Sequence, residues 1–329
     1  MSNTETHPVE LHGRAGPCPR DDAGYPLVEV LTSRAVPLGG PRAMTVRRTL
    51  PQRQRSLIGA WCFVDHYGPD DVAATGGMDV PPHPHTGLQT VSWLFDGEIE
   101  HRDSGGVHAR VRPGELNLMT GGHGICHSEV STAATTTLHG AQLWVALPDA
   151  ARGADRDFQH HAPPVTRLGG GSAKVFLGEL AGHRSPVATF TPLLGAELTV
   201  DPGARMPVAV DPAFEHGVLV DSAALHLADT ALAGGDLGYV GAGEATLTLT
   251  NPTDRPARAL LLGGAPFDEP IVMWWNFVGR SHEEIVGYRR EWQDEADRFG
   301  RVAGYPGARL PAPPLPNARL RPRRNPPAP

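Results

Sequence analysis

The 329-residue sequence has few cysteines and no long hydrophobic run, and both shortages exclude whole classes of protein. Its three cysteines, Cys18, Cys62 and Cys126, are an odd and scattered set, which is unlike a disulfide framework and is typical of a reducing cytoplasm. No stretch approaches the roughly 18 consecutive apolar residues that a membrane helix needs. Residues 1–13 carry acids and histidines where a secretory signal would be apolar. We therefore expect a cytoplasmic protein with no membrane segment.

The sequence also lacks an excess of positive charge. Its 29 Lys and Arg residues are outnumbered by 36 Asp and Glu residues, and the formal net charge of −7 argues against an extended nucleic-acid surface. Hydrophobic residues nevertheless make up 40% of the chain, which excludes disorder of the whole molecule. We expect a folded protein that does not bind nucleic acid directly.

Glycine and proline are abundant, at 39 and 33 residues, and they divide the chain into short apolar runs. Residues 88–95, for example, form such a run and end at Asp96-Gly97, a strong hairpin signal. Strands of this length and spacing predict an antiparallel sandwich or barrel. Gly114-Glu115-Leu116 in the first half resembles Gly235-Asp236-Leu237 in the second, so we also predict an internal duplication.

Composition divides the chain into five segments. Residues 1–25 are polar and predict a flexible arm, and residues 26–150 predict an N-terminal barrel domain. Residues 151–171 are richer in proline, glycine and charge, and predict a linker to a C-terminal domain at residues 172–303. Residues 304–329 hold nine prolines and five arginines with no acid, which predicts a disordered tail.

One helix is predicted near the end of the second domain. Ser281 and Glu284 have the spacing of a capping box, and Gly300 is placed to end the helix. Between them the apolar residues recur at helical spacing: Ile285, Tyr288, Trp292, Ala296 and Phe299. We expect this helix to pack on the barrels.

Two short motifs carry the candidate chemistry in a chain with 16 histidines. His83 and His85 are two residues apart, and the same spacing separates His127 from Glu129. Side chains two apart on a strand share a face. If the two strands are neighbours that face a barrel interior, three imidazoles and one carboxylate meet at one point. This set suits a first-row divalent ion and leaves two octahedral positions open for substrate and oxygen.

Other candidates near these motifs are weaker. Cys126 adjoins His127 and points to the opposite face, which predicts a small core residue, with oxidation sensing as a minor alternative. His101 and His108 are expected to be structural or surface residues. His123 lies in a glycine-rich turn and is a candidate for the mouth of the site.

The second half of the chain offers no pair of ligands two residues apart. Glu215 and His216 are adjacent and therefore face opposite ways on a strand, and His226 stands alone between two leucines. We expect the C-terminal domain to be metal-free and to serve as scaffold and cavity wall.

The ordered set of motifs resembles the pirin family. In the first half the resemblance rests on His-Pro-His-x-Gly at 83–87, Thr90-Val91-Ser92-Trp93-Leu94, Glu100-His101-x-Asp103-Ser104, Pro113-Gly114-Glu115, Gly122-x-Gly124-Ile125 and His127-Ser128-Glu129. In the second half it rests on Leu261-Leu262-Gly263-Gly264-x-Pro266, Glu269-Pro270 and Asn276-Phe277-Val278. The resemblance covers roughly residues 26–303.

The resemblance implies an all-β bicupin, with two antiparallel jelly-roll (cupin) barrels and a C-terminal helix. It implies one divalent metal ion per chain, usually Fe(II), in the N-terminal barrel on His83, His85, His127 and Glu129. Mn, Co, Ni, Cu or Zn would also suit these ligands. Gln89 stands where many cupins and pirins carry Glu. Because the carboxylate ligand corresponds to Glu129, we expect Gln89 to act around the ligands and not on the metal.

Two functions are consistent with this resemblance. Several bacterial pirins are similar in their site to quercetinases, which implies a metal-dependent dioxygenase, an oxidoreductase that cleaves a flavonol-like aromatic substrate with O2. Glu129 would then be the catalytic proton acceptor. The alternative is a non-catalytic regulatory protein whose iron redox state changes its affinity for a protein partner, as proposed for nuclear pirins. Both functions need the same four ligands.

Overall fold

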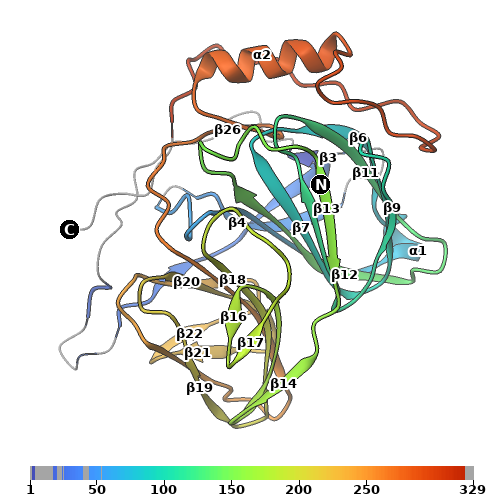
Figure 1. The fold of residues 1–329 in the computed structure, drawn as a ribbon. Helices are drawn as coiled ribbons and strands as arrows, with labels where there is room; N and C mark the ends of the chain where they lie inside the picture. Colours follow the sequence, from blue (N-terminus) through green and yellow to red (C-terminus); the bar gives the residue numbers. More distant parts are fainter. Residues whose placement is uncertain are drawn as a thin grey trace.

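Two antiparallel β-barrels and a C-terminal helix, α2 (His282–Gln293), make up the chain (Figure 1). The computed structural model describes residues 2–3, 18–20, 24, 26–39, 44–52 and 54–322. Each barrel has one larger and one smaller sheet. The predicted bicupin architecture is therefore confirmed.

The first barrel contains the larger sheet of eight strands and a facing sheet of four. In spatial order the larger sheet consists of β1 (Ser2–Asn3), β3 (Arg34–Gly39), β4 (Thr45–Leu50), β5 (Trp61–Asp71), β12 (Thr137–Ala146), β7 (Leu88–Asp96), β10 (Leu116–Thr120) and β13 (Asp157–His161). The facing sheet consists of β6 (Asp79–His85), β11 (Ile125–Ser131), β8 (Ile99–Asp103) and β9 (His108–Val111). A single-turn helix, α1 (Val72–Thr75), follows β5.

The second barrel repeats this plan. Its larger sheet consists of β14 (Val165–Leu168), β15 (Gly171–Leu177), β18 (Leu193–Val200), β25 (Ala257–Gly264), β20 (Glu215–Ser222), β23 (Leu237–Val240) and β2 (Glu29–Leu31). Its smaller sheet consists of β19 (Arg205–Ala209), β24 (Thr246–Thr250), β21 (Leu225–Leu227) and β22 (Thr230–Leu232). Two short hairpins complete the chain: β16 (Glu179–Leu180) with β17 (His183–Arg184), and β26 (Val272–Trp274) with β27 (Phe277–Gly279).

The two barrels are related by the order of their strands. The order β5-β12-β7-β10-β13 corresponds to β18-β25-β20-β23-β2, and β6-β11-β8-β9 corresponds to β19-β24-β21-β22. Strands β10 and β23 occupy matching places, and they begin at the two leucines of the repeated Gly-acid-Leu motif. The predicted internal duplication is therefore visible in the topology.

The boundaries between the barrels differ from those that composition predicts. Strand β2 lies inside the expected first domain but pairs with β23 of the second barrel. Strand β13 lies inside the expected linker but pairs with β10 of the first barrel, and β14 then begins the second. The connection without strand structure thus shrinks to residues 162–164. Composition cannot show which sheet edge receives a short strand, because that depends on backbone partners distant in sequence.

The barrels share one apolar core across their interface. Trp93 of the first barrel lies 4.5 Å from the ring of Phe176 in the second, and its indole N–H donates to Glu197. The indole N–H of Trp61 donates to the carbonyl oxygens of Leu194 and Gly263. Because these aromatic side chains are fully buried, separating the barrels would expose a large apolar area. The shared core holds the two barrels as one unit.

Helix α2 lies over the first barrel, on the side away from the second (Figure 1). The hydroxyl of Ser281 accepts from the Glu284 N–H at 3.2 Å, so the predicted N-cap is confirmed. The helix ends at Gln293 and not near Gly300, because Glu295 adopts a left-handed conformation (φ 54°) and its N–H bonds to the Trp292 carbonyl. Neither helix of the described residues is long and apolar enough to cross a membrane.

Residues 304–322 do not form the disordered tail that their composition predicts. The indole N–H of Trp292 donates to the Leu310 carbonyl at 2.8 Å, and the Leu310 N–H donates to the Pro82 carbonyl at 2.9 Å. Further on, Ala312 is buried and the Leu320 N–H bonds to His282. Composition predicts disorder because this segment has little apolar surface of its own, but α2 and β6 provide partners. Residues 323–329 lie outside the described residues.

The described part of the N-terminal arm is also attached. Cys18 is buried in the core of the second barrel, and its N–H donates to the Ala242 carbonyl at 2.8 Å. Arg20 forms an ion pair with Glu244. The expectation of a flexible arm therefore fails for residues 18–20, while residues 4–17 lie outside the described residues.

Candidate metal centre

The two histidine motifs lie on neighbouring antiparallel strands of the first barrel. In the register of β6 and β11, His127 faces His83 and Ile125 faces His85. A β-bulge between His127 and Glu129 shifts the pairing, so that Glu129 lies opposite Val80. All four candidate ligands are at most 1% exposed. The two residues of each motif share a face, as their spacing requires, and in the structure that face is buried.

The three imidazoles converge on one point. The Nε2 atoms of His85 and His127 are 3.0 Å apart, and the ring of His83 lies 4.4 Å from that of His127. One nitrogen from each of the three rings lies within 4.8 Å of the others. Three nitrogen atoms at this spacing can share one cation.

Backbone carbonyls determine which nitrogen of two of these rings carries the proton. The Nδ1 of His83 lies 2.9 Å from the Pro81 carbonyl, and that of His85 lies 3.1 Å from the Asn276 carbonyl. Because a carbonyl only accepts, each Nδ1 donates, and each Nε2 keeps its lone pair. The Nε2 of His83 is buried and has no hydrogen-bond partner. These donor atoms fit a first-row divalent cation.

The electrostatics favour the protonation states that metal binding requires. Burial lowers the pKa of His83, His85 and His127 well below its usual value, so the imidazoles are neutral near pH 7. Burial raises the pKa of Glu129, but the surrounding electrostatic interactions and hydrogen bonds outweigh burial and hold this pKa below its usual value. Glu129 is therefore a carboxylate, beside His127 and His101.

Polar side chains of β7 and β12 surround the carboxylate. The Ser92 hydroxyl lies 3.2 Å from Glu129 Oε1 and 2.9 Å from Gln142 Oε1, so one proton is shared between two acceptors. Gln89 is buried on the same strand as Ser92, and its amide donates to the Thr120 hydroxyl at 3.0 Å. Gln89 is three residues from Ser92 and therefore faces the other side of β7, so the structure does not place it beside the carboxylate.

His101 lies in the site, although its position in the sequence predicts a structural or surface residue. It is 3% exposed, and its Nδ1 is 3.4 Å from Nδ1 of His127, while its Nε2 is 3.1 Å from Asp103. The available signal is the two-residue spacing of His101 and Asp103, which places both on one face of β8. His108, in contrast, is exposed and paired with Glu100, as expected of a surface residue.

His123 and Cys126 lie around the centre without entering it. The His123 ring bonds to the Ala154 carbonyl at 3.2 Å. Cys126 is buried against α2, and its sulfur points toward the Gly300 carbonyl. Burial raises the pKa of its thiol to about 11, so it stays a neutral thiol at neutral pH. Cys126 is therefore the small core residue that its position next to His127 predicts.

The turn after His85 is fixed by a segment that follows the second barrel in sequence. The Val278 N–H donates to the Thr86 carbonyl at 3.0 Å. Gly87 has a left-handed φ of +66°, and a Cβ there would lie 2.3 Å from the Val278 carbonyl oxygen. The glycine of the His-Pro-His-x-Gly motif therefore allows the close approach that places the Asn276 carbonyl against His85.

The matching strands of the second barrel carry apolar residues. In the register of β19 and β24, Met206 faces Leu249 and Val208 faces Leu247, and all four are buried in the core of that barrel. Glu215 hydrogen-bonds to Tyr239 and the Gly59 N–H, while His216 is buried on the larger sheet. These contacts support the prediction of a metal-free second barrel.

A second histidine cluster joins the two barrels. His66 and His139 of the first barrel both point to one oxygen of Asp221 in the second, at 2.7 and 2.6 Å, and Arg258 binds its other oxygen at 2.7 Å. A further guanidinium, that of Arg47, lies 3.1 Å from Nδ1 of His66. Two arginines already supply positive charge here, so the cluster suits an ionic link between barrels better than a metal.

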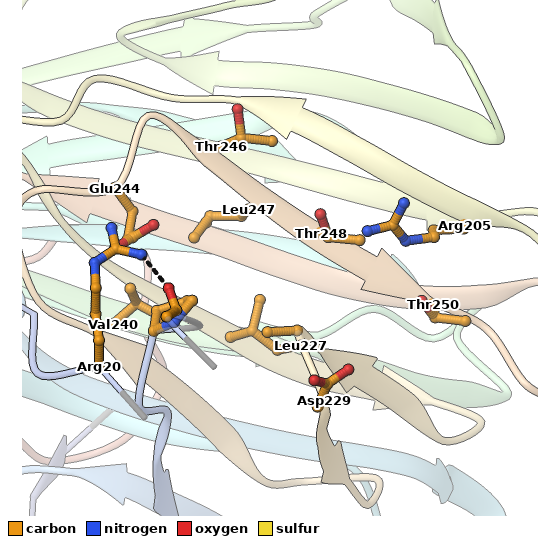
Figure 2. Close-up of a pocket in the computed structure, with 13 residues that line it drawn as sticks. Arg20, Arg205, Leu227, Asp229, Val240, Glu244, Thr246, Leu247, Thr248 and Thr250 are labelled. Atoms are coloured by element: carbon orange, nitrogen blue, oxygen red, sulfur yellow. Dashed lines mark hydrogen bonds and ion pairs between the residues drawn. The ribbon is translucent and has the colours of Figure 1, made fainter. Parts of the chain in front are cut away.

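Hollows elsewhere on the described residues are separate from the candidate ligands. One of about 240 Å³ lies on the outer face of β24, lined by Thr246, Thr248 and Thr250 beside the Arg20–Glu244 pair (Figure 2). Another of about 340 Å³ lies between the outer face of β6 and β11 and the segment after α2, with Cys126 in its wall. Neither is lined by one of the four candidate ligands.

Comparison with known proteins places both halves of the chain. Residues 43–145 match the Pirin family, and residues 195–300 match the Pirin C-terminal cupin domain. A Pseudomonas aeruginosa protein named "Putative quercetin 2,3-dioxygenase PA1205" is 43% identical over 96% of this chain and 98% of its own length.

Solved structures show the same fold. The crystal structure of quercetin 2,3-dioxygenase from Acinetobacter baumannii is 38% identical, with a TM-score of 0.84 over 89% of this chain and 97% of that one. The bacterial pirin YhhW from Escherichia coli, solved in complex with nickel(II), shares the fold at 14% identity, with a TM-score of 0.57 over 73% of this chain and all of its own. With both of its domains matched in order, the chain belongs to the pirin family.

Proposed function

We propose that this protein is a mononuclear metal-dependent dioxygenase of the quercetin 2,3-dioxygenase type, with flavonol-like substrates and O2. The observation that carries the proposal is the convergence of three buried, neutral imidazoles beside an ionised carboxylate. His83, His85, His127 and Glu129 would hold the ion, most simply Fe(II). The 38% identical quercetin 2,3-dioxygenase and the nickel complex of YhhW support a metal-based oxidoreductase.

When bound, the ion supplies a Lewis acid that lowers the pKa of a coordinated hydroxyl group. The protein itself orients two of the imidazoles. Nδ1–H of His83 donates to the Pro81 carbonyl, and Nδ1–H of His85 donates to the Asn276 carbonyl, which fixes both rings. Glu129 is ionised and buried, so its carboxylate can accept the hydroxyl proton of a flavonol. The Ser92 hydroxyl holds the carboxylate in place for this transfer. Buried walls around the four residues exclude bulk water.

The first test is the metal itself. One equivalent of Fe(II) or Co(II) should bind per chain, and His127→Ala should reduce the content far below one while the fold is kept. His108→Ala is the matched control, because His108 is an exposed histidine of the same sheet. Gln89→Glu should leave the stoichiometry unchanged, since Gln89 bonds to Thr120. Full metal retention in His127→Ala contradicts the assignment.

The second test is turnover, followed with an oxygen electrode. The Fe(II)-loaded protein should consume O2 only when a flavonol is added. Glu129→Gln should lower kcat by about 10²- to 10⁴-fold with a much smaller loss of metal, because an amide coordinates through oxygen but takes no proton. A metal-replete protein that consumes no O2 with a panel of flavonols and catechols would favour the redox-sensing regulatory protein instead.

A further inference from the structure

A chain of three side chains leads from the end of β8 to the candidate metal centre. Asp103 Oδ2 lies 3.1 Å from Nε2 of His101, and Nδ1 of His101 lies 3.4 Å from Nδ1 of His127. All three residues are at most 3% exposed. His127 and Asp103 are direct cross-strand partners in the register of β11 and β8. The chain therefore runs through the interior from one strand to its neighbour.

The direction of the protons in this chain follows from Asp103. A carboxylate only accepts, so Nε2 of His101 carries a proton and donates it to Asp103. A neutral His101 then has a lone pair on Nδ1, which accepts from Nδ1–H of His127. As a result Nε2 of His127, the atom 3.0 Å from Nε2 of His85, is left with its lone pair toward the centre. One carboxylate thus selects the tautomer of two imidazoles.

We propose that Asp103 and His101 are positioning residues that fix the metal-binding tautomer and ring orientation of His127. The inference deepens the proposed function and rests on its metal centre. His83 and His85 have backbone carbonyls in this role, and His127 has the Asp103–His101 pair in their place. Partners of this kind raise the basicity of a ligand, and their loss typically lowers metal affinity by roughly 10- to 100-fold.

His101 acts behind His127 and is not a fifth ligand. It approaches His127 from the Nδ1 side, whereas His85 approaches from the Nε2 side, so the imidazole of His127 lies between His101 and the centre. Its other nitrogen is taken by Asp103. The ring of Phe158 packs against His101 at 4.9 Å and limits its rotation.

The decisive variant is Asp103→Asn. Oδ1 of Asp103 accepts from the N–H groups of Gly105 and Val107, and the amide oxygen can keep both bonds. The amide nitrogen then faces His101 and donates, which reverses the chain: His101 carries its proton on Nδ1 and His127 on Nε2. That proton blocks the metal. Glu100→Gln is the matched control, because it makes the same carboxylate-to-amide change on the same strand beneath the exposed His108.

Two measurements test the hydrogen-bonded series of Asp103, His101 and His127. Competition with a chelator should give a Kd for Co(II) that is about 10- to 100-fold higher in Asp103→Asn and unchanged in Glu100→Gln. In the metal-free proteins, ¹⁵N shifts from long-range ¹H–¹⁵N spectra should place the His127 proton on Nδ1 in wild type and on Nε2 in Asp103→Asn. If Asp103→Asn does not fold, His101→Phe, which keeps the packing on Phe158, should still weaken Co(II) binding 10-fold or more.

Wild-type affinity in Asp103→Asn together with an unchanged His127 tautomer would overturn the inference. Binding of Co(II) by His101→Phe as tightly as by wild type would overturn it too. Failure of wild-type protein to bind any metal would instead refute the proposed function, while the ¹⁵N spectra would still decide whether Asp103 controls the His127 tautomer. The two failures are therefore distinguishable.

Discussion

Gly87→Ala should damage both the stability and the metal affinity of this protein. Gly87 is left-handed, with a φ of +66°, and this conformation costs a residue with a Cβ about 1–2 kcal/mol. The new Cβ would lie 2.3 Å from the Val278 carbonyl oxygen, so strand β27 must move by about 1 Å to reach van der Waals contact. Overpacking of this kind adds about 1–3 kcal/mol. We therefore expect a loss of about 2–5 kcal/mol in the free energy of unfolding.

The same displacement should reach the metal centre. Moving β27 draws the Asn276 carbonyl away from Nδ1 of His85, which removes the acceptor that orients this ligand. Loss of such a partner weakens metal binding about 10- to 100-fold. Urea unfolding of the metal-free protein measures the loss in the free energy of unfolding, and a Co(II) titration against a chelator measures the change in Kd.

Gly203→Ala is the matched control. Gly203 has nearly the same φ, +65°, but no atom lies within 4 Å of its Cβ position. Gly203→Ala should therefore lower the free energy of unfolding only by the cost of the left-handed conformation, about 1–2 kcal/mol, and should keep the wild-type affinity for Co(II). Equal destabilisation by the two substitutions, or an unchanged Kd for Co(II) in Gly87→Ala, would refute the reasoning.

Three further outcomes are expected. Asp221→Asn should lower the free energy of unfolding by about 3–5 kcal/mol in urea at pH 7, because Arg258 loses its buried partner. Since the pKa of Asp221 is lowered in the folded state by its histidine and arginine partners against the effect of burial, the difference from wild type should shrink as the pH falls below about 4. Cys62 and Cys126, with pKa values raised by burial to about 12 and about 11, should not react with a thiol reagent at pH 8 until urea unfolds the protein; rapid labelling of the native state would contradict this. Burial also lowers the pKa of His83, so the unfolded chain takes up a proton there more readily than the folded protein. The free energy of unfolding of the metal-free protein should therefore fall progressively below about pH 6.5, and a constant free energy of unfolding between pH 7 and 5 would contradict this expectation.

The ligand face could be predicted because a strand has a period of two. His83 and His85 must share a face on any strand, and so must His127 and Glu129. The same argument places Cys126 on the face of β11 opposite the ligands, and in the structure it packs there against α2. Local patterning is sufficient for these assignments because they depend only on neighbours along the chain.

Contacts between distant segments could not be predicted in this way. The pairing of β2 with the second barrel depends on a free edge at β23, some 200 residues away, and no local pattern encodes that edge. His101 enters the site only because β8 lies next to β11. Residues 304–322 are ordered by partners on α2, whereas composition counts only the surface that a segment buries against itself.

The contacts that Asn276 and Val278 make with the turn after His85 also set an order of assembly. Residues 83–129 leave the ribosome long before Asn276 and Val278, so a nascent chain has the four candidate ligands well before it has the carbonyl that orients His85. Only after the whole second barrel has been synthesised can β27 dock on the first and complete the centre. A chain that stops short of residue 276 contains all four candidate ligands but lacks the carbonyl that orients His85. Metal binding at full affinity therefore requires synthesis through residue 278, because loss of the Asn276 carbonyl weakens binding about 10- to 100-fold.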